Sequence, residues 1–414
     1  MAGRPPSIAS YGMDDSGIRR SSIVGILMSS FAGLVIVSPI THFYDFGTNG
    51  AQRVILTSIL FGYDTGTISG VKEMKFWLKT FGHETSPGSG EYTISTPHES
   101  LVVSILSLGT FFGALLAAPM ADILGRRWAI LAACAVFSAG IAMQTAAITI
   151  PLFVVGRVFA GLGVGMVSCL VPMYQAESSP KWIRGAVVSV YQWAITIGIF
   201  LSACVNQATK DRMDFGSYRI PTAIQLIWTC ILSTGMFLLP ESPRWLLKTH
   251  QDSEAAHALG RLLSVPDNHP DVQFEMEEIK ANLRMEEEEG GRSSYKDCFR
   301  MGPNKVLLRT LTGILLQAWQ QLTGVNFIFY YGTTFFKRSG VSDPFLITIA
   351  TNIVNVGMTV PAFWAVDHLG RRKLLLIGAV GMLVCEYLVA IIGVTISVEN
   401  ATGQRVLVAF VCVY

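Results

Sequence analysis

Two side chains of opposite charge lie within otherwise apolar stretches, where an ionisable group is a candidate functional residue. Asp64 falls late in one apolar run, and Arg157 lies in another run that starts near Pro151. Each is about six positions from the same boundary if both runs cross a membrane, which would put them at one depth. A charge in hydrocarbon costs several kcal/mol unless it is paired or hydrated. The sequence therefore predicts a direct ion pair that loads or releases a proton when it closes or opens, with a static pair that fixes helix packing as the alternative.

Uncharged amides in apolar surroundings form a second polar group. Its members are Gln192, Gln317, Gln320, Gln321, Asn326, Asn352 and Asn355. Gln317, Gln320 and Gln321, together with Gly324, follow the i, i+3, i+4, i+7 spacing of one helix face, and a polar face at mid-membrane implies a cavity. Amides donate and accept hydrogen bonds without charge, which suits a neutral polyhydroxyl ligand. Hydrogen bonding between helices is the alternative for any single amide.

Aromatic residues follow the same stretch of chain. They are Trp319, Phe327, Phe329, Tyr330 and Tyr331. Their rings are suited to the apolar face of a polyhydroxyl ring, although isolated aromatic residues more often serve simple packing.

Composition excludes several classes of protein. Hydrophobic residues make up 51% and charged residues 14% of the chain, the mean hydropathy is +0.46 and the formal net charge is +2. These values are typical of an integral membrane protein and give no support for nucleic-acid binding. The sequence contains no zinc motif, nucleophile elbow or phosphate loop, so we expect no enzyme activity, no cofactor and no bound metal. Six cysteines fall singly in apolar stretches and are interpreted as free, buried thiols: Cys134, Cys169, Cys204, Cys230, Cys385 and Cys412.

Apolar runs of membrane-spanning length divide the chain into two blocks. Candidate spans cover roughly 100–121, 128–149, 152–173, 186–205, 220–239, 307–332, 344–366 and 373–397. The predicted organisation is an amino-terminal tail at 1–22, a first membrane block at 23–239, a hydrophilic linker at 240–304 and a second block at 305–414. Before residue 72, Ile23–Ile40 and Val54–Val71 could each span the membrane, and we expect only one of them to cross.

The distribution of basic residues predicts the orientation. The tail, the linker and the loops near Arg126, Lys181 and Arg371 carry an excess of Lys and Arg, which is typical of the cytosolic side. The 72–99 segment and the sequon at Asn400 are then external. Short amphipathic helices are expected in the linker, with a merely solvated segment as the alternative for its acidic run at 286–289.

Glycines recur inside two of the predicted spans. They are Gly109, Gly113, Gly161, Gly163 and Gly165. An apolar span surrounds them rather than a strand-to-helix turn, so a nucleotide-binding loop is not indicated. Small residues let two membrane helices approach closely, and we expect this role for them.

One short signature occurs in both blocks and suggests an internal duplication. It comprises Asp122, Gly125, Arg126 and Arg127 in the first block, and Asp367, Gly370, Arg371 and Arg372 in the second. Other motifs of the sequence are 157–165, Pro172 to Glu177, Pro240 to Arg244 and 320–326, and Arg184 lies in the basic loop that follows the second of these. Together they resemble the sugar porters of the major facilitator superfamily, above all the fungal hexose transporters, over nearly all of 59–414.

The resemblance implies an all-α integral membrane protein with the major facilitator fold, two pseudo-symmetric helical halves and alternating access. The family has twelve helices, of which this chain would hold about nine complete and part of a tenth. The resemblance assigns hexose binding to Gln192, Gln320, Gln321, Asn326 and Asn355. Proton coupling is expected at Asp64 and Arg157, from the predicted ion pair, and a cytosolic gate is expected at the two signatures with Glu177, Arg184, Glu241 and Arg244.

The function expected from this resemblance is transport of a monosaccharide, by proton symport. A facilitative uniporter is the close alternative, and a sugar sensor that signals through a cytosolic segment is a more distant one. We expect a monomer in the lipid bilayer, at the plasma membrane, with the amino terminus in the cytosol, a sugar and a proton as its small-molecule partners and no nucleic acid.

Four departures from the family pattern lead to further expectations. Ile123 replaces a usual arginine in the first signature, and Glu386 stands where an uncharged residue is expected. The final apolar run, from Val406 to Tyr414, is too short to cross a membrane alone. Joining Leu34 to Leu60 would restore an uninterrupted first helix, so residues 35–59 are interpreted as an insertion of translated intron sequence. We therefore expect the 414-residue chain to be inactive as it stands.

Overall fold

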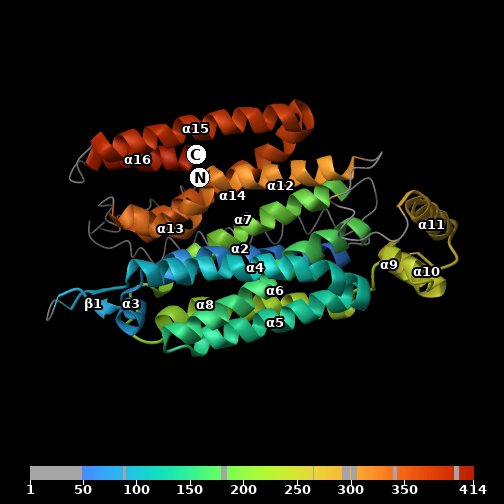
Figure 1. Cartoon of the computed structure of the whole chain (residues 1–414), viewed down its shortest axis with the longest axis horizontal. Coiled ribbons are helices and arrows are strands. Elements are labelled where there is room, and N and C mark those ends of the chain that lie inside the picture. The colour runs from blue at the N-terminus through green and yellow to red at the C-terminus, as the bar shows by residue number, and fades with distance from the viewer. Residues whose placement is uncertain are drawn as a thin grey trace, which may run out of the picture. The chain divides into compact units, whose positions relative to one another are not determined.

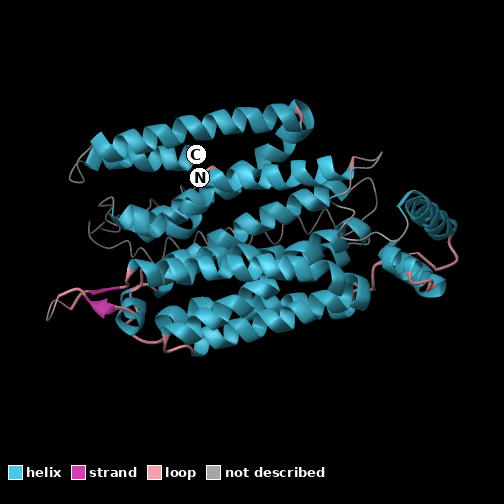
Figure 2. Cartoon of the chain, in the orientation of Figure 1, coloured by secondary structure: helices cyan, strands magenta, loops and turns pink. Residues whose placement is uncertain are grey.

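The computed structural model describes residues 49–86, 90–178, 184–263, 265–290, 299, 305–338, 343–395 and 401–414. Figures 1 and 2 show that these residues are almost entirely helical. The exception is a hairpin in which β1 (His83–Glu84) pairs antiparallel with β2 (Tyr92–Thr93), beside the short helix α3 (Lys75–Phe81). The amino-terminal tail, the Ile23–Ile40 run and the sequon at Asn400 lie outside the described residues.

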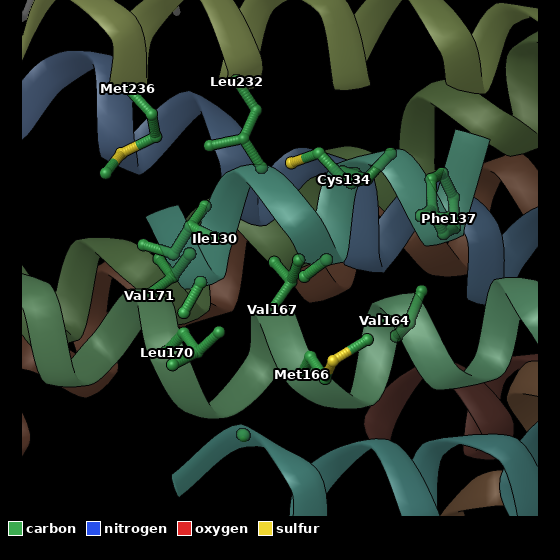
Figure 3. Packing of buried hydrophobic residues seen from close by; sticks show 14 of the residues in the cluster. Ile130, Cys134, Phe137, Val164, Met166, Val167, Leu170, Val171, Leu232 and Met236 are labelled. Carbon is green, nitrogen blue, oxygen red and sulfur yellow. The ribbon is translucent and has the colours of Figure 1, made fainter. Parts of the chain in front are cut away.

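Six long helices form the first block. They are α2 (Asn49–Val71), α4 (Thr96–Leu124), α5 (Arg126–Ala146), α6 (Ile150–Ser178), α7 (Arg184–Thr209) and α8 (Gly216–Leu238). Buried apolar side chains from α5, α6 and α8 interdigitate in their core (Figure 3). The side chains labelled there are Ile130, Cys134, Phe137, Val164, Met166, Val167, Leu170, Val171, Leu232 and Met236.

Glycines set the distance between α4 and α6, as the sequence predicted. A Cβ atom on Gly113 would lie 2.2 Å from the carbonyl oxygen of Leu162, and one on Gly165 would lie 2.2 Å from that of Thr110. These separations are far below van der Waals contact, so only glycine permits the observed approach of the two helix backbones. The prediction of small-residue packing is confirmed for this pair of helices.

The hydrophilic linker contains three helices, α9 (Pro243–Lys248), α10 (Asp252–Leu263) and α11 (Pro270–Gly290). Ser242 caps α9 by accepting a hydrogen bond from the Trp245 amide at 3.4 Å. An apolar cluster of their own holds the three helices together, with Leu246, Leu259 and Val272 at its centre. The predicted short amphipathic helices are therefore present, and the acidic run at 286–289 lies within α11.

The second block contains α12 (Val306–Leu322), α13 (Val325–Arg338), α14 (Pro344–Leu369), α15 (Arg371–Thr395) and α16 (Ala401–Val413). The sequence predicted a candidate span at roughly 307–332, and the structure divides this stretch between α12 and α13. The helix breaks at Thr323 and Gly324, where Gly324 has a φ of +82°. A left-handed residue cannot continue an α-helix, and glycine is the residue that adopts it without strain.

Six of the described helices are long and apolar enough to cross a membrane, namely α4, α5, α6, α8, α14 and α15. Many of their large apolar side chains are exposed, among them Phe111, Leu115, Leu376 and Val380. Such outward-facing apolar surface is what a lipid environment covers. The chain is a multi-pass membrane protein of mainly α-helical structure.

Cys134, Cys204 and Cys385 are buried, but Cys169 and Cys230 are exposed, because they lie on the outward faces of α6 and α8. The prediction that Cys169 and Cys230 are buried thiols was therefore wrong.

Helix α2 runs without interruption from Asn49 through Asp64, so it includes the last part of the 35–59 stretch. The interpretation of that stretch as an insertion stays a prediction.

Candidate functional site

The charged pair predicted from the sequence is formed between α2 and α6. Arg157 Nη1 lies 3.7 Å from Asp64 Oδ1, and both side chains are almost completely buried, at 2% and 1% exposed. The Arg157 Nε donates a hydrogen bond to the carbonyl oxygen of Val102 at 3.3 Å. Within the described part of the chain, Asp64 Oδ1 and Arg157 Nη2 have no hydrogen-bond partner. The pair is thus buried, but its hydrogen bonds are incomplete. A rearrangement of either side chain therefore breaks few hydrogen bonds.

Both halves of the protein contribute to the surroundings of this pair. Gln225 from α8 interacts with the Asp64 carboxylate, and Tyr330 from α13 lies in the electrostatic field of both charged groups. Because α13 belongs to the second block, a movement of one half relative to the other changes what surrounds the charged pair.

A cavity of about 270 Å³ lies where α2 and α7 meet α13, α14 and α16. The polar residues that line it are Ser69, Asn206, Thr333, Thr348, Thr351, Asn352 and Asn355. Apolar and aromatic residues complete the wall, including Phe329, Phe336 and Phe345. A mostly apolar cavity with a few placed polar groups is the usual form of a small-molecule site.

The amides predicted to bind a ligand are only partly brought together. Asn355 lines the cavity, and Asn326 stands between two lining residues, Val325 and Ile328. Asn326 also donates a hydrogen bond to Gln321 Oε1 across the break between α12 and α13. Gln192 and Gln320 are exposed and are not part of the cavity wall.

The reason for this difference lies in α12. None of its residues is buried in the described structure, so its polar face, which carries Gln317, Gln320 and Gln321, does not close over the cavity. Of the predicted aromatic residues, Phe329 lines the cavity, whereas Trp319 and Phe327 are exposed.

Sequence reasoning missed the hydroxyl groups and one amide of the cavity wall. Ser69 and Gly66 are three positions apart on α2, and Asn206 lies one and two turns beyond Ala203 and Ile199 on the facing side of α7. This helical spacing was readable in the sequence. Serine and threonine are common inside membrane helices, however, where they bond to their own backbone, so residue type alone gave no signal.

A dense polar network occupies the end of the bundle that carries the Gly125 turn, here called the arginine end. Arg126 forms a two-pronged ion pair with Glu177, with Nε–Oε2 at 2.9 Å and Nη2–Oε1 at 3.0 Å. The Glu241 carboxylate accepts the backbone N–H groups of Arg126 and Arg127 at 2.9 and 3.1 Å. It therefore caps the amino terminus of α5, where an anion is favoured by the helix dipole.

This network ties the linker to the first block. Trp245 Nε1 donates to the carbonyl oxygen of Asp122 at 3.2 Å, and Lys248 Nζ lies 3.6 Å from the Asp122 carboxylate. Arg244 pairs with Glu286 of α11 on the exposed side. Ile123, at the position where an arginine was expected, is 77% exposed.

The second copy of the signature repeats the backbone turn of the first. Gly370 has a φ of +76°, close to the +86° of Gly125, and each joins two long helices. Arg371 and Arg372 are exposed and, within the part of the chain that the structure describes, form no ion pair. The side chains of Arg184 and Asp367 lie outside the described residues.

Several hydrogen bonds between described residues join the two halves at the opposite end of the bundle, here called the far end. Glu73, just after α2, accepts hydrogen bonds from Thr334 at 2.6 Å and from Lys337 at 2.9 Å. Asp343, just before α14, accepts from Lys210 at 2.8 Å and from Gln207 at 3.5 Å. Nearer the middle, Trp193 Nε1 donates to the carbonyl oxygen of Val356 at 3.3 Å. These bonds close the far end over the cavity.

Comparison with known proteins shows to which family the chain belongs. The family described as sugar (and other) transporter matches residues 50–414. The chain belongs to the sugar porters of the major facilitator superfamily. The family resemblance predicted from the repeated signature is thereby confirmed, as are the major facilitator fold and the assignment to transport rather than enzyme catalysis.

Several fungal sugar porters are similar along most of the chain. A major facilitator-type transporter of Aspergillus rugulosus, ecdD, is 49% identical over 87% of this chain and 68% of its own length. The probable glucose transporter rco-3 of Neurospora crassa is 43% identical, over 86% of this chain and 60% of its own length. The high glucose sensor RGT2 of Saccharomyces cerevisiae is 41% identical, over 87% of this chain and 47% of its own length. The chain thus spans about half to two thirds of the length of these relatives.

Among solved structures, the proton:xylose symporter XylE bound to 6-bromo-6-deoxy-D-glucose is similar with a TM-score of 0.72 and 26% sequence identity. The match covers 90% of this chain and 79% of that chain. A partially occluded, inward-open structure of XylE from E. coli matches with a TM-score of 0.71 and 24% identity, over 89% of this chain and 84% of that chain, which supports the fold.

Proposed function

We propose that this sugar porter carries a hexose across the membrane by alternating access, with the cavity between the two halves as its binding site. The observation that carries the proposal is the cavity itself, since helices of both halves line it and neutral hydroxyl and amide groups supply its polarity. Neutral donors and acceptors suit a sugar, whereas an ionic substrate would need a charged partner in the wall. The naming of a Neurospora relative as a probable glucose transporter supports a hexose.

The arginine end faces the cytosol in this proposal. Arg126, Arg127, Arg371, Arg372 and Lys373 lie in the short turns of that end, and short cytosolic loops are enriched in Lys and Arg. The far end, with its inter-half bonds, then faces the outside. A structure bonded across its outer end represents the inward-facing half of the transport cycle.

Proton coupling through Asp64 and Arg157 is the finer part of the proposal. An enclosed carboxylate 3.7 Å from a guanidinium carries its charge only while that partner stays close. The groups that face it from the packed elements are Arg157 of α6, Gln225 of α8 and Tyr330 of α13. When the halves rock, α13 moves relative to α2 and α6, and the carboxylate can exchange its proton. The structural similarity to the proton:xylose symporter XylE supports this mode.

Substitution of Asp64 by asparagine separates a symporter from a facilitator. Asparagine matches the shape of aspartate but cannot ionise, so a symporter should lose accumulation against a gradient while it still exchanges labelled for unlabelled hexose. Accumulation driven by an inward proton gradient and exchange without one should be measured side by side. Unchanged accumulation in Asp64→Asn would show that the pair does not couple proton flow to sugar.

A sugar sensor is the second candidate function, because a high glucose sensor is 41% identical over most of this chain. A sensor would bind through the same cavity and signal through a cytosolic segment. Linker helices α9 to α11 are the described segment that could transmit such a signal, since Trp245 and Lys248 bond to the Asp122 turn. Glucose-dependent signalling that persists in a variant without uptake would favour the sensor.

The basic test of transport is hexose uptake in cells that lack their own hexose carriers. Two forms should be expressed, the 414-residue chain and a fusion that continues with the Neurospora relative's sequence beyond its matched region. Saturable uptake of D-glucose by the fusion, with no uptake of L-glucose, is the expected result. A correctly localised fusion that takes up and binds no hexose would refute the proposed function.

A further inference from the structure

Asn206 of α7 is a buried amide in the cavity wall, and half of its hydrogen-bonding capacity is unused. Its side chain is 2% exposed. The Nδ2 group donates to the carbonyl oxygens of Gly66 at 3.4 Å and Thr67 at 3.2 Å, which fixes the orientation of the amide. The Oδ1 atom is buried and has no hydrogen-bond partner in the described structure. A buried acceptor without a partner destabilises the folded protein, so the position calls for a hydrogen-bond donor.

The backbone beside Asn206 is built to leave room for this amide. A Cβ atom on Gly70 would lie 2.4 Å from Asn206 Nδ2, so a side chain at Gly70 would displace the amide. Gly66, Gly70 and Asn206 all line the same cavity.

The hydroxyl groups of the cavity wall already donate their hydrogens to other protein atoms. Thr348 donates to the carbonyl oxygen of Pro344 at 3.0 Å, so in its contact with Thr333, at 3.3 Å, it accepts. Thr333 therefore donates to Thr348 and accepts from Ser69, at 3.2 Å. Thr351 donates to the carbonyl oxygen of Thr348 at 3.0 Å. Since a hydroxyl has one hydrogen and two lone pairs, each of these groups can offer a ligand only a lone pair.

We propose that Asn206 Oδ1 and the hydroxyl oxygens of Ser69, Thr333 and Thr348 form an acceptor-only subsite that takes the hydrogen of a sugar hydroxyl. Ser69 and Asn206 come from the first half, whereas Thr333 and Thr348 come from the second. A sugar hydroxyl bound here contacts both halves, and it satisfies the acceptor that is otherwise unpaired. This inference rests on the proposed function. It adds that one hydroxyl of the substrate must act as a hydrogen-bond donor.

Deoxy and deoxyfluoro analogues of D-glucose distinguish donation from acceptance. A deoxy analogue has lost the hydroxyl, and a deoxyfluoro analogue keeps a weak acceptor but has lost the donor. At the ring position that occupies the subsite, both analogues should therefore compete for D-glucose uptake about tenfold more weakly than glucose, as expected for the loss of one buried hydrogen bond. Each position of the ring should be scanned in this way with the fusion described above.

Substitutions then assign that position to Asn206. In Asn206→Ala, the penalty for removing the hydroxyl should fall from about tenfold to less than about threefold, because the acceptor is gone. Thr333→Val keeps the volume of the side chain and should reduce the same penalty. Gln144→Ala is the matched control, because Gln144 is also a buried amide that donates to a backbone carbonyl, that of Gly156 at 3.3 Å, but lies outside the cavity wall. It should affect glucose and every analogue by one common factor.

Three outcomes would overturn the inference. Asn206→Ala would behave like Gln144→Ala if the amide only braces α2 or holds a water molecule. A deoxyfluoro analogue that competes as well as glucose, at the position where the deoxy analogue fails, would show that the hydroxyl accepts rather than donates. Absence of any hexose binding would remove the proposed function and this subsite with it, whereas uptake with no position-specific penalty would remove the subsite alone.

Discussion

The negative charge of Asp343 stabilises the contact with Lys210 between the two halves at the far end. Partial burial raises the pKa of its carboxyl, but hydrogen bonds from Lys210 and Gln207 outweigh this, and the pKa lies below the usual aspartate range. Stability from a depressed pKa is fully present above the unfolded value of about 3.9 and is lost as the pH falls through the folded value. The Lys210–Asp343 bridge should therefore be intact from about pH 5 to pH 8.

The pH dependence of thermal unfolding tests this. The difference in melting temperature between the wild type and Asp343→Asn should be constant from about pH 5 to pH 8 and should shrink below about pH 4. A pH dependence of uptake near neutrality should survive in Asp343→Asn, because this residue does not titrate there. A difference in melting temperature that changes between about pH 6 and pH 7 would contradict the assignment.

Glu241 gives a second prediction for a single residue. It accepts backbone N–H groups of Arg126, Arg127 and Ser242, and Glu241→Ala would leave these groups without their partner. The loss should be about 1–3 kcal/mol of stability. Glu286→Ala is the control, since the Arg244–Glu286 pair is exposed and should contribute less than about 1 kcal/mol. Equal melting temperatures of the two variants would show that the cap contributes no more than a surface ion pair.

The sequence predicted single residues well where burial of a charge in the membrane would be energetically costly. Asp64 and Arg157 had to be paired because charges in an apolar span are expensive, and they are paired. Asn206 and the hydroxyls of Ser69 and Thr333 were missed because uncharged polar groups in a membrane helix can bond to a nearby backbone, as Asn206 does to Thr67, or to one another, as Ser69 and Thr333 do. Which of them face a cavity depends on packing between helices.

Among the helices, α4 and α6 make the closest approach, and glycine sets it. Gly165→Ala would place a Cβ atom 2.2 Å from the carbonyl oxygen of Thr110, so the helices must separate, at a cost of about 1–3 kcal/mol. Gly378→Ala in α15 is the matched control, because no described atom lies within 4 Å of a Cβ there. It should be neutral or stabilise by up to about 1 kcal/mol, because alanine favours a helix.

Thermal unfolding of both variants in detergent provides the measurement. Gly165→Ala should lower the melting temperature, and Gly378→Ala should not. If both glycines tolerated alanine equally well, the close packing of α4 against α6 would not be a feature of the folded protein.

Helix boundaries show where sequence reasoning reaches its limit. Apolar length and flanking charges placed α4, α5, α6, α8, α14 and α15 correctly, because a bilayer imposes both. The break at Gly324 was not predicted, since an isolated glycine is tolerated in a helix and only its φ of +82° ends this one. The break matters for the site, because α13 lines the cavity with Phe329 and Thr333 whereas α12, which carries Gln317 and Gln320, does not.

Considered as a whole, the molecule is bonded across its far end by Glu73 and Lys337 and by Lys210 and Asp343. Glu73→Gln weakens the first of these bridges and should shift the population toward the outward-open state. Ser69→Cys, in the cavity wall, reports the change, because a membrane-impermeant thiol reagent applied from outside should label it several-fold faster in the Glu73→Gln background.

Asp214→Asn is the control for that experiment, because the Arg212–Asp214 pair is exposed and lies within the first half. It should leave the labelling rate of Ser69→Cys unchanged. Equal rates in the Glu73→Gln and Asp214→Asn backgrounds would mean that the far-end bridges do not hold the two halves together.

The central claim is that a hexose binds in the cavity between the halves, and a native cysteine tests it most directly. Cys412 lines the cavity, whereas Cys169 and Cys230 are exposed on outer helix faces. Alkylation of the purified 414-residue chain should be followed at each cysteine by mass spectrometry, with D-glucose, with L-glucose and without sugar. We predict that D-glucose slows alkylation of Cys412 several-fold while Cys169 and Cys230 react at unchanged rates, and that L-glucose has no effect. Alkylation of Cys412 at one rate under all three conditions would contradict binding of the sugar in this cavity.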